Sequence, residues 1–74
     1  MKVVVQYEIP IIEELEVQDI PENIHEMIYA DADNWEDYQE ALVLQVRGIL
    51  RARHPNHDVY VNSIKDKNGN IVKW

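Results

Sequence analysis

The sequence of 74 residues has no cysteine, no threonine, one serine and two glycines. Without cysteine, neither disulfide bonds nor thiol chemistry are available. Gly48 and Gly69 are too few and too far apart for a loop that cradles phosphate or a dinucleotide. The single serine, Ser63, falls in a predicted strand and lacks the glycines of a nucleophile elbow. We therefore expect a protein without enzymatic activity and without a cofactor.

Long apolar runs are also missing. No stretch approaches the roughly 20 apolar residues that a membrane-spanning helix needs. The apolar run near the start is interrupted by Gln6 and Glu8, unlike that of a secretory signal peptide. The length predicts one domain over residues 1–74, and the lack of cysteine favours the reducing cytoplasm.

Positive charge is missing from a long stretch of the chain. Residues 8–40 contain twelve acidic side chains and no lysine or arginine, whereas the remainder contains seven basic and two acidic side chains. The two blocks therefore carry −12 and +5, which sum to the net charge of −7. An acidic surface attracts basic proteins and repels nucleic acid and anionic membranes. We expect a protein partner with a basic surface, no direct nucleic-acid binding and no membrane association; the alternative is that the acidic residues serve solubility alone.

Residues 34–53 are the most strongly periodic segment and predict a long helix. At about 100° per residue, its large apolar side chains fall on one side, as on a helix that packs against a sheet. Asp33 or Asn34 is expected to cap the first turn, and Pro55 is expected to end the helix. The predicted apolar stripe consists of Trp35, Tyr38, Leu42, Val43, Val46, Ile49 and Leu50.

A second ridge on the same helix consists of Ala41, Leu44, Gly48 and Ala52, and Leu44 projects almost opposite the apolar stripe. Glycine costs a helix interior about 1 kcal/mol relative to alanine, so Gly48 suggests that another element approaches closely. One interpretation is that the preceding short helix covers this ridge. The other is that a second copy of the chain or a foreign partner binds there.

The remaining pattern predicts strands around a short helix. Residues 2–9 alternate as a half-buried strand does, and residues 59–65 and 71–74 flank an Asn-Gly turn. A short helix is expected at about residues 21–29, with Asp19 as its cap and Pro21 in its first turn. For residues 10–18 we favour one bent strand, or a strand followed by a short extended segment, because a tight hairpin would lack glycine or asparagine at its turn. A helical turn over residues 10–16 is the rival interpretation.

These elements, in the order β-α-α-β-β, predict an α+β fold. We expect a small antiparallel or mixed sheet of three or four strands, with the long and the short helix packed on one face.

The Asn-Gly turn permits two strand registers. A two-residue turn pairs Ile64 with Lys73, whereas a three-residue turn with a left-handed Gly69 pairs Ile64 with Val72. Burial favours the second register, because it places large apolar side chains on one face and leaves Val59 and Val61 on the other. The buried face would carry Tyr60, Ile64, Val72 and Trp74, with Trp74 opposite Asn62.

Two further clusters have simple interpretations. His54, His57 and Asp58 are residue types that bind zinc, but nothing in the sequence places a fourth ligand, such as His25 or a glutamate, beside them. We therefore interpret residues 54–58 as a polar loop. The arginines of the long helix are expected to pair with Glu36, Glu40 and neighbouring acids rather than to bind nucleic acid.

We interpret the chain as a small acidic protein-binding module. In charge and size, though not in motif, it resembles small acidic proteins that viruses and mobile elements use to block host or defence proteins. The resemblance implies an inhibitor whose carboxylates take the place of phosphates on a basic or nucleic-acid-binding surface. The alternative is a homo-oligomeric structural module, a homodimer in the simplest case, joined through Ala41, Leu44, Gly48 and Ala52. The predicted partner-binding residues are Glu22, Glu26, Tyr29, Asp31, Asp33, Glu36, Asp37 and Glu40.

Overall fold

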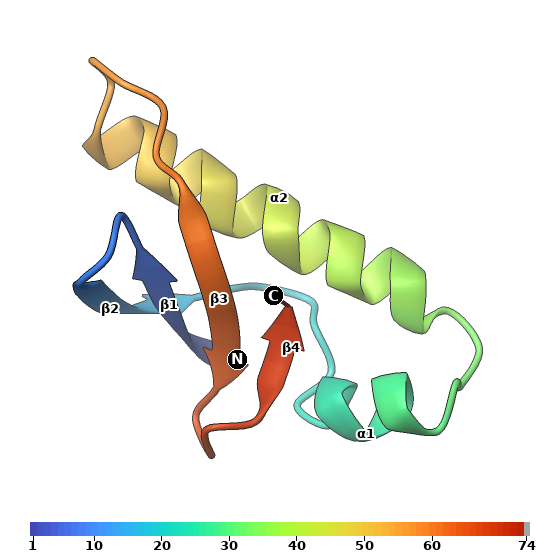
Figure 1. The fold of residues 1–74 in the computed structure, drawn as a ribbon. Helices are drawn as coiled ribbons and strands as arrows, with labels where there is room; N and C mark the ends of the chain where they lie inside the picture. The colour runs from blue at the N-terminus through green and yellow to red at the C-terminus, as the bar shows by residue number, and fades with distance from the viewer. Residues whose placement is uncertain (74) are drawn as a thin grey trace.

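The computed structural model describes residues 1–73 and contains a four-stranded sheet with two helices (Figure 1). β1 (Lys2–Tyr7) and β2 (Ile11–Glu16) come first, α1 (Ile24–Tyr29) and α2 (Trp35–Arg53) follow, and β3 (Val61–Asp66) and β4 (Ile71–Lys73) come last. Neighbouring strands are antiparallel, in the spatial order β2-β1-β3-β4. The predicted α+β class is confirmed, with the element order β-β-α-α-β-β in place of β-α-α-β-β.

The hydrophobic core lies between the helices and one face of the sheet. β1 buries Val3, Val5 and Tyr7, while the alternate residues Val4 and Gln6 are only half-buried. This alternation turns one face of β1 toward the helices. The other core residues come from every remaining element and the loop before α1, namely Leu15, Val17, Ile20, Ile24, Leu42, Val46, Leu50, Ile64 and Val72.

The favoured bent strand at residues 10–18 is wrong, because β1 and β2 form a tight hairpin. Its ladder runs from Tyr7 opposite Ile11 to Lys2 opposite Glu16. The chain reverses without glycine or asparagine: Glu8 adopts a φ of 41°, and the peptide bond between Ile9 and Pro10 is cis. The turn is therefore built from residues that the usual hairpin turn patterns do not include.

The bounds of the long helix agree closely with their prediction, but the predicted side-chain cap is wrong. Asn34 is the N-cap residue, in a left-handed conformation with φ 69° and without a side-chain cap bond, and the helix ends at Arg53, before Pro55. Most of the predicted stripe faces the core. Trp35 is the exception: it is half-buried outside the core, and its indole N–H donates to Asp31 Oδ1 over 2.7 Å.

The short helix begins at Ile24 rather than near Pro21, and its N-cap residue is Asn23. Asp19 does not cap it, because Asp19 adopts a φ of 61° in the connection from β2. Gln45 of α2 holds this connection: its side chain accepts from Gln18 N over 2.7 Å and donates to Gln18 O over 2.8 Å. These two hydrogen bonds hold the connection between β2 and α1 against α2. A local sequence pattern cannot predict them, because Gln45 is distant from Gln18 in the sequence.

The β3–β4 turn combines the two predicted registers. Gly69 is left-handed, with φ 86°, as the three-residue turn requires, and Lys65 lies opposite Ile71. One step further the register slips, so that Ile64 lies opposite Lys73. Asp66 is buried, and its carboxylate accepts from the backbone N–H groups of Asn68 and Asn70, each over 2.9 Å.

A bulge in β3 overturns the prediction for residues 59–61. Gln6 lies opposite Ser63 and Tyr7 lies opposite Val61, so Asn62 is an extra residue in β3. The extra residue changes which side chains face the core. Val59 and Val61 therefore pack against the core, whereas Tyr60 is 72% exposed. The predicted positions of Trp74, on the buried face and opposite Asn62, lie outside the described residues.

Candidate interaction surfaces

One end of the molecule is built from α1, residues 30–34 and the first half of α2 (Figure 1); we call it the helical end. The loop between the helices turns through left-handed residues, Asp31 with φ 50° and Asn34 with φ 69°. Aspartate and asparagine enter this conformation at lower cost than most residues. Together with the Trp35–Asp31 hydrogen bond, this fixes where the acidic residues of the loop stand.

Six of the seven predicted acidic residues belong to this helical end, Glu22 lies just before α1, and all seven are exposed. Glu22 Oε1 lies 3.8 Å from the N-terminal amine. Within residues 1–73, the other six carboxylates have no cationic group within ion-pair distance. Asp31 is also engaged by the Trp35 indole. The carboxylates in question are those of Glu22, Glu26, Asp31, Asp33, Glu36, Asp37 and Glu40.

An apolar hollow lies beside these acids. Tyr29 is 81% exposed, and its ring meets the His25 ring edge-on with 4.7 Å between centroids. Between α1 and the β3–β4 turn is a hollow of about 640 Å³, lined by His25, Ile28 and Tyr29 on one side and by Gly69, Asn70 and Ile71 on the other. The helical end therefore combines free negative charge with an exposed aromatic side chain.

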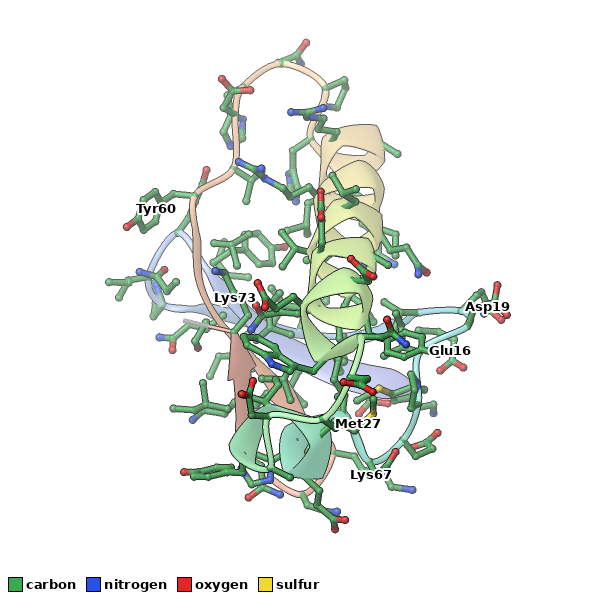
Figure 2. All side chains as sticks on the ribbon, turned by 90° about the vertical axis from the view of Figure 1, so that its right-hand side faces the viewer. Glu16, Asp19, Met27, Tyr60, Lys67 and Lys73 are labelled. Atoms are coloured by element: carbon green, nitrogen blue, oxygen red, sulfur yellow. The ribbon has the colours of Figure 1, made fainter. Side chains whose placement is uncertain are left out.

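The viewpoint of Figure 2 faces this end. Glu16 and Asp19 project on the side opposite to Tyr60 (Figure 2). The acids of the hairpin and those near the helices meet at the N-terminus, because Glu16 Oε1 and Glu22 Oε1 lie 3.2 Å and 3.8 Å from the same N-terminal amine.

The ridge on α2 is not covered by the short helix, so that interpretation is wrong. Leu44 is 60% exposed, Gly48 and Ala52 are exposed, and Ala41 is half-buried against the core. A Cβ atom placed on Gly48 would have no neighbour within 4 Å among the described residues. The reason is the position of α1, which lies below the first turns of α2 rather than alongside its middle (Figure 1).

At the opposite end, acids and histidines engage one another around Tyr7. The Tyr7 hydroxyl donates to Glu13 Oε2 over 2.9 Å and lies 3.3 Å from His54 Nε2. Glu13 also forms an ion pair with Arg53. No local pattern predicts this cluster, because its residues are brought together only by the unexpected β1–β2 hairpin and the end of α2.

The predicted polar loop joins the same cluster. His57 Nε2 lies 3.0 Å from Glu8 Oε1, and the His54 and His57 rings are 5.7 Å apart. Within residues 1–73, no three His, Cys, Asp or Glu side chains stand close enough together to hold a metal ion. None of the helices in this range is long and apolar enough to cross a membrane.

The prediction that the arginines of α2 pair with Glu36 and Glu40 is wrong. Arg53 pairs with Glu13, and in the described part of the chain no carboxylate lies within ion-pair distance of Arg47 or Arg51. The first and last turns of α2 thus present free charges of opposite sign.

Comparison of the chain with protein-family models, curated proteins and solved structures finds no match.

Proposed function

We propose that the protein is a non-enzymatic binding module whose helical end docks on a basic surface of another protein. The observation that carries this proposal is the set of exposed carboxylates at the helical end, which have no counter-charge among residues 1–73 apart from the weak contact of Glu22. A carboxylate already paired within its own chain gains little from a new cation. A free one gains a full new interaction and also attracts the partner over a distance.

The apolar hollow beside Tyr29 offers a site for the apolar contacts that give an interface most of its affinity. Exposed charges steer two proteins together, but aromatic anchors in desolvated pockets provide most of the affinity of an interface. Tyr29 stands beside the acids and next to a hollow wide enough for a side chain of the partner. In the sharpest form of the proposal, the module is an inhibitor that covers a nucleic-acid-binding surface, with carboxylates in place of phosphates.

A pull-down from bacterial lysate, after nuclease treatment, tests this function. The bait is compared with a variant that carries Glu26→Gln, Asp33→Asn and Glu40→Gln, and with a matched variant that carries Glu8→Gln, Glu14→Gln and Glu16→Gln. We expect a basic protein that stays bound at about 50 mM salt, elutes at about 500 mM salt, and is lost with the first variant only. Equal loss with both variants would mean that net charge, rather than the helical end, determines binding.

The exposure of Leu44 and Gly48 favours a second candidate, a homo-oligomer joined through α2. In this case the chain is a dimer at tens of micromolar and Leu44→Glu dissociates it, because the interface would bury Leu44. Analytical ultracentrifugation measures this directly, and a wild-type monomer at that concentration removes the candidate.

A further inference from the structure

We propose that the free edge of β3, together with α2, binds an extended acidic peptide that adds a strand to the sheet beyond the end of β4. Within residues 1–73, β4 consists of Ile71–Lys73 and pairs with Ile64 and Lys65 of β3. β3 continues through Val61–Ser63, where β1 lies on one side and, within residues 1–73, no strand lies on the other. Unpaired strand edges are the sites at which extended peptides add to a sheet.

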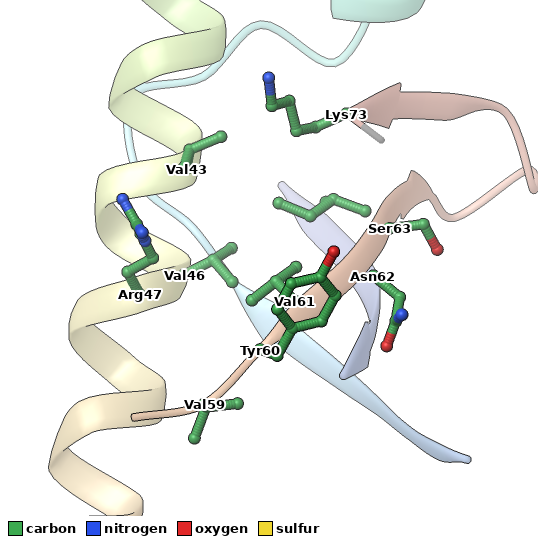
Figure 3. Close-up of a pocket in the computed structure, with 10 residues that line it drawn as sticks. Val43, Val46, Arg47, Val59, Tyr60, Val61, Asn62, Ser63 and Lys73 are labelled. Carbon is green, nitrogen blue, oxygen red and sulfur yellow. The ribbon is translucent and has the colours of Figure 1, made fainter. Parts of the chain in front are cut away.

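A groove lies along this free edge. It has a volume of about 380 Å³ and separates α2 from β3 (Figure 3). The buried side chains of Val46 and Ile64 belong to its lining, and the half-buried Val43, Val59 and Val61 complete its apolar part. An added strand would therefore place alternate side chains against valines rather than into water.

The backbone of β3 is oriented for this pairing. The amide of Glu8 donates to the carbonyl of Tyr60 over 2.8 Å, so the Tyr60 carbonyl faces β1. Because successive residues of an antiparallel strand direct their N–H and C=O groups to alternate sides, those of Val61 face the groove. They are the hydrogen-bonding groups that an incoming strand would use first.

Charge at the groove selects an acidic occupant. Arg47 of α2 and Lys73 of β4 border it, both are exposed, and neither lies within ion-pair distance of a described carboxylate. Two further hollows adjoin the groove, one lined by Glu40 and Val43 and the other by Asp58 and Val59. Each therefore carries a carboxylate that would repel an acidic side chain. We therefore expect the acidic side chains of the peptide near its centre, between Arg47 and Lys73.

A display selection tests the occupant. Random peptides of about eight residues, a common strand length, are selected on phage against the full chain, the Lys73→Glu variant and the Lys67→Glu variant. The last two have the same net charge, and Lys67 lies in the β3–β4 turn away from the groove. Trp74 is kept in all three.

We expect peptides that alternate apolar and acidic residues. They should bind the wild-type chain and Lys67→Glu alike and Lys73→Glu about tenfold more weakly or worse. No enrichment, enrichment of basic peptides, or equal binding to Lys73→Glu overturns the proposal. If a second copy of the chain occupies the groove instead, the wild-type chain sediments as a dimer and Lys73→Glu dissociates it. That outcome also overturns the peptide proposal.

Strand addition has its own readout. N-methylation of the alternate peptide residues that face β3 should weaken binding by about tenfold or more, whereas methylation of the other residues should leave it unchanged. The Val61 amide should become protected from hydrogen exchange in the complex. Equal effects of both methylation sets, or an unprotected Val61, contradict the assignment. Glu26→Gln with Asp33→Asn should not alter peptide binding, which separates this groove from the acidic helical end.

Discussion

The acids of the β1–β2 hairpin and the acids of the helical end belong to the same negatively charged stretch of sequence, but their surroundings differ. In the hairpin, Glu8 lies 3.0 Å from His57, Glu14 lies 3.3 Å from Lys2, and Glu16 lies 3.2 Å from the N-terminal amine. Glu13 is held by both Tyr7 and Arg53. At the helical end, Glu26, Asp33 and Glu40 are exposed without a described counter-charge.

This difference shows that net charge alone does not tell which carboxylates already have a partner within the described residues. In the hairpin, Glu13 joins β2 to Tyr7 and to the end of α2 through Arg53, whereas Glu26, Asp33 and Glu40 have no described cationic partner; we propose that these three bind the partner. Substitutions in the hairpin should therefore change mainly stability, and substitutions at the helical end should change mainly binding.

The largest expected difference concerns two tyrosines. Tyr7→Ala should lower the free energy of unfolding by about 3–4 kcal/mol, because it empties a buried site and removes the hydroxyl that joins Glu13 to His54. Urea denaturation followed by circular dichroism measures the change. Tyr29→Ala, at a site 81% exposed, is the control and should change stability by less than about 0.5 kcal/mol. Similar losses in both variants would contradict the division between the two regions.

Neutralising the free acids should have the next largest effect. The triple variant with Glu26→Gln, Asp33→Asn and Glu40→Gln is expected to bind its partner about tenfold more weakly, or about 1.4 kcal/mol, and with a smaller salt dependence. Calorimetric titration with the captured protein gives the dissociation constant. The matched hairpin variant, with Glu8, Glu14 and Glu16 changed to glutamine, should retain the wild-type affinity. A similar loss of affinity in this variant would contradict the prediction.

Glu13→Gln should lower the free energy of unfolding by about 1 kcal/mol, since the ion pair with Arg53 is lost and the Tyr7 hydroxyl meets a weaker acceptor. Chemical denaturation again provides the value. Glu40→Gln, which removes one charge from a site without a described partner, should leave stability nearly unchanged. The opposite ranking of these two variants would show that the hairpin acids are not structural.

The smallest effect is expected at Gly48. Gly48→Ala should raise the free energy of unfolding by about 0.5–1 kcal/mol, because alanine favours the helix and the added methyl group meets no described neighbour. Thermal unfolding measures it. Gly69→Ala is the contrasting control and should destabilise, because Gly69 holds a φ of 86°. If the Gly48→Ala variant is instead less stable and less oligomeric than the wild-type chain, a second copy of the chain packs against the α2 ridge at Gly48.

How far the sequence predicts the structure depends on whether a feature is encoded locally. The bounds of the long helix were predictable because the apolar stripe and the Pro55 that follows it shortly afterwards are local features of the sequence. The placement of Glu26, Asp31, Asp33, Glu36, Asp37 and Glu40 at one end follows from their positions in consecutive elements. The β1–β2 hairpin was missed because Glu8 and a cis Pro10 make a turn without the usual residues. Tyr60 was wrongly predicted to face the core, because a single extra residue, Asn62, changes which side chains of β3 face it. No sequence pattern predicts that bulge.

The position of β1 in the sheet has a consequence for how the domain forms during synthesis. β1 is an inner strand, and it is flanked by β2, which follows it almost immediately, and by β3, whose Asp66 pairs with Val3. The hairpin and both helices rest on contacts between near neighbours in sequence, which form early, while the β1–β3 pairing must close a loop of nearly the whole chain. A ribosome-bound chain that has not yet released β3 lacks Ile64 and Val72 of the core and one of the two strands that pair with β1. We therefore expect the late pairing of β1 with β3 to set the folding rate.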